Sequence, residues 1–197
     1  MKGRLVSAGL TLLMALPVAT QAADLKRAEE IVGGRCFLCH GMEGEAASAL
    51  YPRLAGQHAE YIAKQLSDFK SGKRKSDTMS GMAADLTTEE MKALGTFFEQ
   101  KKPSHSSHAD TDLAAVGRYI FTKGNQYSGV ASCTSCHGPK GYGTPQLPRL
   151  AGQQPLYLEN QLKQFNSRER NNDNAVMHSI ASKLTELEVK AVSSYIS

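Results

Sequence analysis

The chain has 197 residues, 41% of them hydrophobic and 21% charged, a composition typical of globular proteins and unlike that of disordered ones. Its formal net charge is +4 and its basic residues form no long stripe, which argues against a protein that binds nucleic acid. The length allows one large domain or two small ones.

Residues 1–23 have the pattern of a secretory signal peptide. Lys2 and Arg4 precede an apolar run of about 14 residues, which is shorter than the roughly 20 residues that span a bilayer. Small residues follow in the sequence ATQAAD, so we expect cleavage after Ala22 or Ala23 and export of the chain. Export removes two basic residues and no acidic one, which brings the net charge closer to neutral.

The remainder of the chain contains two copies of one pattern. YPRLAGQ at 51–57 returns as LPRLAGQ at 147–153, and YIAKQLSDFKSGKR at 61–74 returns as YLENQLKQFNSRER at 157–170. Two copies with so long a period indicate a duplicated domain rather than a solenoid of short repeats.

The two copies meet at a polar stretch, KKPSHSSHADTD at 101–112, which contains a proline and has no apolar periodicity. Such a composition is typical of a linker. We therefore expect a first domain over residues 24–100 and a second domain over residues 113–197, joined by this linker.

Each copy has the residue spacing of amphipathic helices. Tyr61, Gln65 and Phe69 recur at helical intervals, and we interpret this stripe and its counterpart in the second copy as core. Thr87 and Thr185 each stand three residues before a glutamate, which is the capping box that begins a helix. No segment alternates as a half-buried strand does, so we expect an all-α fold.

One segment of the first copy is locally basic. It reads KSGKRKSD at 70–77, and it is short and bordered by acidic residues. We interpret it as the solvated end of a helix, and the alternative is a docking patch for an acidic partner.

Two short segments carry the chemistry of the chain, RCFLCHG at 35–41 and SCTSCHG at 132–138. A zinc site could be built from two CxxC pairs, but it would leave the histidine after each pair unexplained. A redox CxxC site belongs to a strand–helix context that this sequence lacks. The two segments use all the cysteines of the chain, which are Cys36, Cys39, Cys133 and Cys136.

CxxCH is the attachment signature of c-type haem. Two cysteines at this spacing bond covalently to the two vinyl positions on the porphyrin edge, and the next residue places its imidazole under the iron. The sequence therefore predicts two covalently bound haem c groups, with His40 and His137 as iron ligands.

A methionine thioether is the usual ligand on the opposite face of the iron in low-spin electron carriers. In the second copy only Met177 follows the attachment segment. The repeat aligns Met177 with Met79, so we predict these two methionines as iron ligands and interpret Met82 and Met91 as core residues. The candidates in the first copy are Met42, Met79, Met82 and Met91.

Together these features resemble the dihaem cytochrome c4 family: CxxCH, PRLAGQ, YxxxQLxxF and a methionine followed by xx[IM]A are all present twice. The resemblance covers nearly all of the chain after the signal peptide. It implies two small all-α class I cytochrome c domains related by a pseudo-twofold axis. It also implies an electron carrier of the bacterial periplasm, of a kind often held loosely at the inner membrane.

The resemblance further implies roles for residues close to each haem. In class I cytochromes c a proline carbonyl accepts a hydrogen bond from the proximal imidazole, and Pro52 and Pro148 stand where that proline is expected. The polar residues that follow these prolines are placed to approach haem propionates: Arg53 and Arg149, with Gln57 and Gln153 as weaker candidates. The alternative for these four residues is ordinary surface hydrogen bonding.

Two functional classes are open. The first is a monomeric electron carrier without catalytic residues, which takes electrons from a quinol-oxidising complex and delivers them to a terminal oxidase. The second is the electron-transfer subunit of a flavoprotein dehydrogenase, whose flavin would lie on another chain. A dihaem peroxidase is disfavoured, because it needs an iron with a vacant or displaceable ligand and both copies carry a methionine.

The duplication itself suggests that the second domain adds something that depends on proximity. A flexible linker of about 12 residues would span roughly 20 Å, so we expect the two domains to pack together. The PRLAGQ loops are our candidates for this contact. We expect electrons to pass between the two haems faster than they pass to a partner protein.

Overall fold

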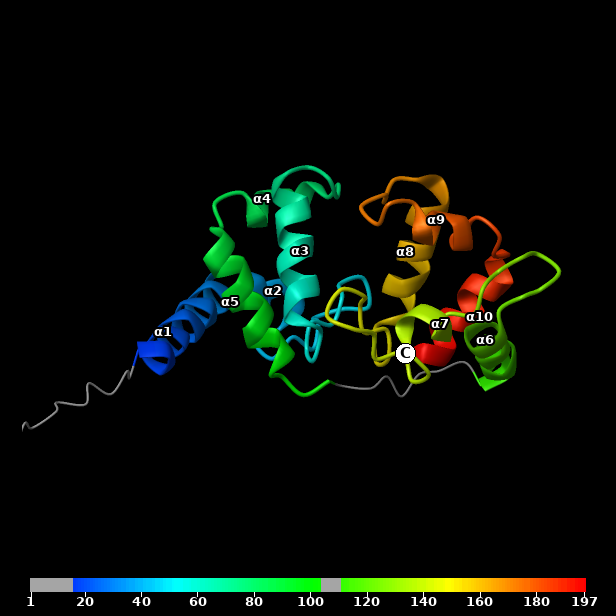
Figure 1. The fold of residues 1–197 in the computed structure, drawn as a ribbon, viewed down its shortest axis with the longest axis horizontal. Helices are drawn as coiled ribbons and strands as arrows, with labels where there is room; N and C mark the ends of the chain where they lie inside the picture. The colour runs from blue at the N-terminus through cyan, green and yellow to red at the C-terminus, as the bar shows by residue number, and fades with distance from the viewer. Residues whose placement is uncertain (1–15, 104–110) are drawn as a thin grey trace, which may run out of the picture.

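The computed structural model describes residues 16–103 and 111–197, which form two helical domains lying side by side (Figure 1). Residues 1–15, which hold most of the predicted signal peptide, lie outside the described residues, as do residues 104–110 of the predicted linker. No helix in the described part of the chain is long and apolar enough to cross a bilayer.

The described residues confirm the expected all-α fold, because their only extended pairing is the isolated bridge between Asn125 and Val130. The first domain contains α1 (Leu16–Ile31), the π-helical segment η1 (Val32–Cys36), α2 (Phe37–His40), α3 (Ala59–Lys70), α4 (Asp77–Ala83) and α5 (Thr88–Glu99). The second domain contains α6 (Thr111–Lys123), α7 (Thr134–His137), α8 (Pro155–Ser167), α9 (Val176–Ala181) and α10 (Glu186–Ile196).

The last helix of each domain begins at the predicted capping box. Thr87 accepts a hydrogen bond from the Glu90 amide at 3.1 Å, and the Glu90 carboxylate accepts one from the Thr87 amide at 2.9 Å. Thr185 and Glu188 repeat the arrangement at the start of α10. These bonds satisfy amide groups that would otherwise be unpaired at the first turn of the helix.

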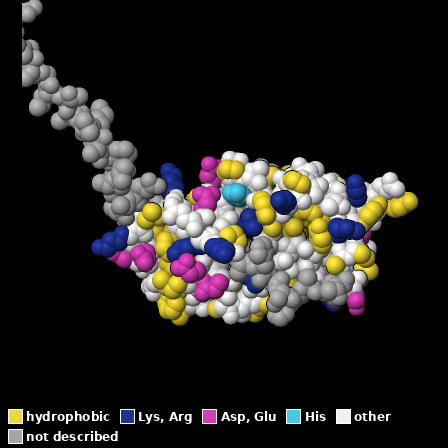
Figure 2. Space-filling model, turned by 90° about the horizontal axis from the view of Figure 1, so that it is seen from below, with side chains coloured by type: hydrophobic (Ala, Val, Ile, Leu, Met, Phe, Trp, Pro, Cys, Tyr) yellow, Lys and Arg dark blue, Asp and Glu magenta, His cyan; other side chains and the backbone are white. Residues whose placement is uncertain are grey.

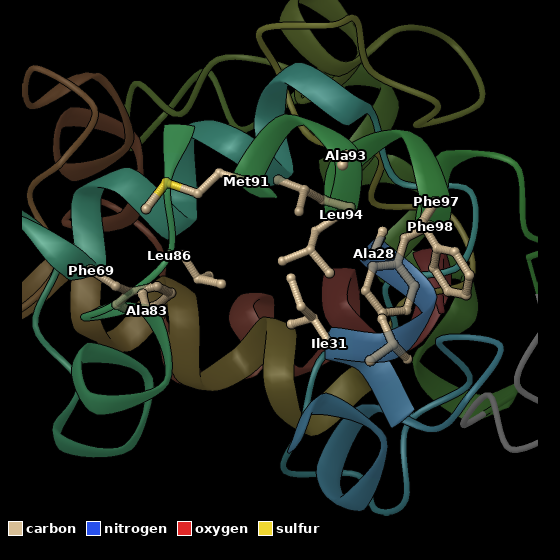
Figure 3. Close-up of a cluster of buried hydrophobic side chains, with 12 residues drawn as sticks. Ala28, Ile31, Phe69, Ala83, Leu86, Met91, Ala93, Leu94, Phe97 and Phe98 are labelled. Carbon is tan, nitrogen blue, oxygen red and sulfur yellow. The ribbon is translucent and has the colours of Figure 1, made fainter. Parts of the chain in front are cut away.

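Each domain is built around its own apolar core. In the first domain, α1 and α5 cross so that Leu94 points toward Ile31, and the rings of Phe97 and Phe98 lie beside Ala28 (Figure 3). In the second domain, α6 and α10 pack in the same way. The fully buried residues of that smaller cluster are Ile120, Phe121 and Val192.

Charged side chains of both signs reach the surface. On the face seen in Figure 2, Lys and Arg are interspersed with Asp and Glu over the first domain, and hydrophobic side chains lie between them. This distribution fits a chain whose basic and acidic residues nearly balance.

The two domains meet along α3 and α8, which face each other across the middle of the molecule (Figure 1). Arg74, which follows α3, donates to the Tyr157 hydroxyl of α8 at 3.0 Å. Arg170, which follows α8, donates to the Tyr61 hydroxyl of α3 at 2.9 Å. The second bond repeats the first with the domains exchanged, because Tyr157 and Arg170 are the counterparts of Tyr61 and Arg74.

Two glutamines join the crossed pairs. Gln161 Oε1 accepts from both guanidinium groups at 2.7 Å. Gln65 Oε1 accepts from Arg74 at 2.8 Å and from Arg170 at 3.3 Å. The two like charges are thus bridged by neutral carbonyl oxygens. We call this set the arginine clamp, and its members are Tyr61, Gln65, Arg74, Tyr157, Gln161 and Arg170.

Both arginines of the clamp are buried. Each guanidinium also lies over a phenylalanine ring of its own domain, 4.6 Å from the centroid at Phe69 and 4.5 Å at Phe165. A buried guanidinium is tolerated only where its donors are satisfied and its charge is partly compensated. The clamp therefore depends on both domains being present in this orientation.

These contacts correct two interpretations made from the sequence. Tyr61 and Gln65 were interpreted as core of their own domain, but they bond to the opposite domain. The segment 70–77 was interpreted as a solvated helix end, but Arg74 within it is buried at the domain contact, whereas Lys73 is exposed. The helical spacing of the stripe is confirmed, but Tyr61 and Gln65 contact the opposite domain rather than the core of their own domain.

Arg74→Gln should destabilise the protein by about 2–3 kcal/mol, because the bonds of a buried charged donor are lost. Lys73→Gln, which removes the same charge from an exposed neighbour, should change the free energy of unfolding by less than about 0.5 kcal/mol. Urea unfolding followed by circular dichroism measures both. Equal and small effects of the two substitutions would show that the clamp does not form in solution.

Candidate functional site

Each CxxCH segment ends a short helix. Helix α2 ends at His40 and α7 ends at His137. The next residue is a glycine in each case, with φ of 77° at Gly41 and 79° at Gly138. Side chains rarely permit this backbone conformation, so the glycine lets the chain turn sharply away from the histidine.

Both histidines are buried and hydrogen-bonded to the predicted prolines. The Nδ1 atom of His40 lies 3.0 Å from the Pro52 carbonyl oxygen, and Nδ1 of His137 lies 3.1 Å from that of Pro148. A carbonyl oxygen can only accept a hydrogen bond, so each Nδ1 carries the proton. The structure therefore brings together the histidine and the proline that the sequence predicted to be partners.

The protonation state of the two rings suits metal ligation. Burial lowers the pKa of His40 and of His137, and the bond to the proline carbonyl opposes this shift only in part. The rings are therefore neutral at pH 7, with Nδ1 protonated and the lone pair of Nε2 available as a ligand.

The first cysteine of each pair lies in surroundings that disfavour a zinc site or a redox dithiol. Burial raises the pKa of the Cys36 thiol and raises that of Cys133 to about 11. Zinc ligands and reactive dithiols need a thiolate, which these surroundings disfavour. Across residues 24–103 and 112–197, no three His, Cys, Asp or Glu side chains gather closely enough to hold a metal ion.

Part-buried apolar side chains pack against each core together with the first cysteine of the attachment segment. In the first domain Cys36, Leu54 and Leu66 pack at the edge of the core without being fully buried. A flat apolar group such as a porphyrin would complete the burial of this wall. The histidine, the cysteines and the wall together fit a covalently bound haem. The equivalent residues of the second domain are Cys133, Leu150 and Leu162.

The structure separates the methionines of the first domain. Met91 is buried in the core, as expected, whereas Met82 is 41% exposed, so its interpretation as a core residue was wrong. Met42 is also exposed. Met79 is part-buried and packs against the same cluster as Cys36. These placements support Met79 as the iron ligand of the first domain, which stays a prediction.

In the second domain, Met177 lies in the first turn of α9, and its amide donates to the Asp173 carboxylate at 2.5 Å. The neighbouring His178 uses both ring nitrogens elsewhere: Nδ1 lies 2.9 Å from the Phe165 carbonyl oxygen, and Nε2 accepts from Arg168 at 3.1 Å. His178 is therefore committed to protein contacts, which supports Met177 as the ligand.

The PRLAGQ loops meet at the domain contact, as expected from the sequence. Gln153 Oε1 accepts from the Arg53 amide at 2.7 Å, and Gln153 Nε2 donates to the Arg53 carbonyl at 2.9 Å. Gln57 brackets Arg149 in the same way, at 2.8 Å and 3.0 Å. The oxygen and one N–H of each glutamine amide are thus used by the opposite loop, which disfavours both residues as candidates for propionate binding.

The guanidinium group of Arg53 has a buried donor that lacks a partner. Its Nη1 atom donates to the Gly152 carbonyl at 2.7 Å, while its Nε atom is buried without a partner. Burial also lowers the pKa of Arg53, an effect that a nearby carboxylate would offset. An acceptor such as a propionate would fit this atom. Arg149 donates from Nε to the Ala151 carbonyl at 3.0 Å and stacks on the Tyr142 ring.

Family models match both halves of the chain. The model described as "Cytochrome C oxidase, cbb3-type, subunit III" matches residues 23–98, and the model described as "Cytochrome c" matches residues 114–197. Two separate matches of this kind agree with a duplicated domain.

The similarity to known proteins extends over most of the chain. Cytochrome c4 of Thiocapsa roseopersicina is 38% identical over 90% of this chain and 94% of its own length. The thiosulfate dehydrogenase electron acceptor of Thiomonas intermedia is 36% identical over 82% of this chain and 76% of its own length. The crystal structure of reduced recombinant cytochrome c4 from Pseudomonas stutzeri superposes with a TM-score of 0.82, at 34% identity, over 87% of this chain and 96% of that one.

Met79→Leu should remove the thioether-to-iron charge-transfer band of one site, so that the band of the whole protein falls by about half. The reduction potential of that site should also fall, because a thioether favours the ferrous state. Absorption spectroscopy and a redox titration measure the two effects. Met82→Leu is the matched control and should leave both properties nearly unchanged. The opposite result would mean that the two copies are aligned three residues out of register.

Proposed function

The chain belongs to the cytochrome c4 family, whose members are dihaem c-type electron carriers, and from this premise we propose how it works and with what it exchanges electrons. Its cofactors are two haem c groups. We assign their attachment to the cysteine pairs of residues 36–39 and 133–136. We assign the iron ligands to His40 with Met79 and to His137 with Met177.

The observation that carries this proposal is that both domains repeat the complete set of groups that we assign as haem attachments and iron ligands. Each has a buried histidine fixed by a proline carbonyl, a cysteine pair directly before it and a part-buried methionine further along the chain. An enzyme of this architecture would need one iron with a ligand that leaves easily. Two equal, closed sites are instead what electron transfer requires.

The protein groups at each site are suited to passing electrons without other chemistry. Haem iron supplies a one-electron couple between its ferric and ferrous states. An imidazole whose Nε2 atom binds iron and a thioether take up no proton near neutral pH, so electron transfer would not be tied to proton transfer at these ligands. The apolar wall keeps water from the site, which limits solvent rearrangement when the charge changes.

We infer that electrons arrive from a quinol-oxidising complex and leave to a terminal oxidase, in the periplasm. The signal-peptide pattern of residues 1–23 supports export of the chain. The nearly balanced charge of the mature protein supports transient docking to protein partners rather than tight electrostatic binding. After export, the protein would act as a monomer. It would diffuse between the complexes or associate with the surface of the inner membrane.

A second candidate function is that of dedicated electron acceptor for a dehydrogenase. The relative in Thiomonas intermedia, named a thiosulfate dehydrogenase electron acceptor, favours this candidate. The partner expected from the sequence is a flavoprotein dehydrogenase, whereas this relative points to an enzyme that oxidises a sulfur compound. The protein would carry the electrons away, and the catalytic residues would lie on the other chain.

Stopped-flow kinetics distinguish the two functions. The reduced protein is mixed with membranes that contain an active terminal oxidase, and in a second experiment the oxidised protein is mixed with thiosulfate and a thiosulfate dehydrogenase. We expect reoxidation by the membranes and its abolition by cyanide, which blocks the oxidase. Reduction by the dehydrogenase without reoxidation by membranes would favour the second function. No electron exchange in either experiment would contradict the proposal.

A further inference from the structure

One peptide group in the first domain joins the predicted iron ligand to the opposite domain. This is the peptide group between Pro52 and Arg53. Its carbonyl oxygen accepts the hydrogen bond from Nδ1 of His40, at 3.0 Å. Its N–H group donates to Oε1 of Gln153 in the second domain, at 2.7 Å. The first domain's histidine and the second domain's glutamine are therefore bonded to the two ends of a single amide.

The same arrangement exists with the domains exchanged. The carbonyl of the peptide group between Pro148 and Arg149 accepts from His137 at 3.1 Å, and its N–H donates to Oε1 of Gln57 at 2.8 Å. Two independent copies with nearly equal distances show that the geometry is a property of the domain contact rather than of one loop.

The glutamines are well shielded from water. Their exposed fractions are 5% at Gln57 and 6% at Gln153. The cavity between the two loops has a volume of about 10 Å³, which is at the lower limit for a single water molecule. Each glutamine's orientation is fixed, because its amide nitrogen donates to the carbonyl of the same arginine whose N–H it accepts. If either glutamine side chain is removed, the backbone N–H of Arg53 or Arg149 loses its acceptor at a position that bulk water does not freely reach.

Hydrogen bonds on the two ends of an amide strengthen each other. When the N–H group donates, electron density moves toward the carbonyl oxygen, which becomes a better acceptor, an effect of roughly 10–30% per bond. A better acceptor draws the Nδ1 proton of the histidine more strongly. The imidazole then donates more electron density through Nε2, which favours the ferric state and lowers the reduction potential.

We propose that Gln153 tunes the reduction potential of the haem in the first domain and that Gln57 tunes that of the haem in the second domain. Each is a positioning residue that acts across the domain contact through the proline–arginine peptide group. The inference rests on the proposed ligation of the irons by His40 and His137. It gives the domain contact an electronic role in addition to its mechanical one.

The test replaces each glutamine with methionine, which has a similar length and no hydrogen-bonding amide. In Gln153→Met the potential of the first-domain haem should rise, with a shift of about threefold in its equilibrium constant for reduction, or about 28 mV at 59 mV per tenfold change. The second-domain haem should keep its potential. Gln57→Met should give the reverse pattern. Spectroelectrochemical titration of the full dihaem protein measures both potentials.

A second readout follows the hydrogen bond itself. In nitrogen-15 histidine-labelled protein, the Nδ1 proton resonance of His40 should move upfield in Gln153→Met, as expected for a weaker hydrogen bond, and that of His137 should not. Gln154→Met is the matched control, because it makes the same change one residue later in a side chain that does not bond the opposite loop. It should leave both potentials and both resonances unchanged.

The crossed pattern separates tuning from simple damage. A substitution that merely loosened its own domain would shift the potential of the haem in that same domain. If Gln153→Met shifts the second-domain haem, shifts both equally or shifts neither, the proposal is wrong. Failure of the proposed function is distinguishable, because an incorrect assignment of the iron ligands would already appear in the spectrum of the unsubstituted protein. The titration also requires no partner protein.

Discussion

The hydrogen bond from each buried histidine to a proline carbonyl is the interaction on which the rest of the structure depends. It holds the Nδ1 proton in place, so that Nε2 is the atom available for the iron ligation that we propose. It also fixes the position of the loop that carries the proline. Because that loop continues directly into Arg53 or Arg149, the same bond determines where the backbone meets the other domain. The proposed ligation and the contact between the domains therefore depend on the same peptide group.

The pseudo-twofold arrangement explains which residues the two copies share. A symmetric contact uses the same surface from both partners, so a residue that serves on one side has an equivalent that serves on the other. Tyr61, Gln65 and Arg74 meet this condition, as their counterparts in the second domain make the exchanged bonds. The PRLAGQ loops meet it as well, through Gln57 and Gln153. Many of the residues that the two copies share are thus residues that form the contact between the domains.

The features that could be predicted from the sequence are those set by local spacing. CxxCH places two thiols and an imidazole on one helical turn, and the capping boxes at Thr87 and Thr185 depend on residues three positions apart. The prolines could be placed by the family resemblance, because their distance from the histidine is nearly constant. The helices follow from the same kind of pattern, whereas the duplication follows from the long repeat, and the contact between the domains is expected from the short linker.

The remaining features depend on which surface a helix faces, and periodicity does not reveal this. The stripe of Tyr61 and Gln65 has the spacing of a core face whether it packs against its own domain or another. Arg74 stands in a basic run that resembles a solvated helix end, although it is buried. One signal was available: a tyrosine, a glutamine and an arginine keep the same spacing in both copies. Polar residues repeated in this way are expected at a symmetric contact.

Amide hydrogen exchange tests most directly the claim that each histidine is linked through one peptide group to the opposite domain. The amides of Arg53 and Arg149 lie in loops, where exchange is ordinarily fast. If they donate to the buried glutamines as described, they should exchange as slowly as the helical amide of Met91. Exchange as fast as that of an exposed loop residue such as Ala49 would show that the domain contact opens readily, and would contradict the linkage between ligand and contact.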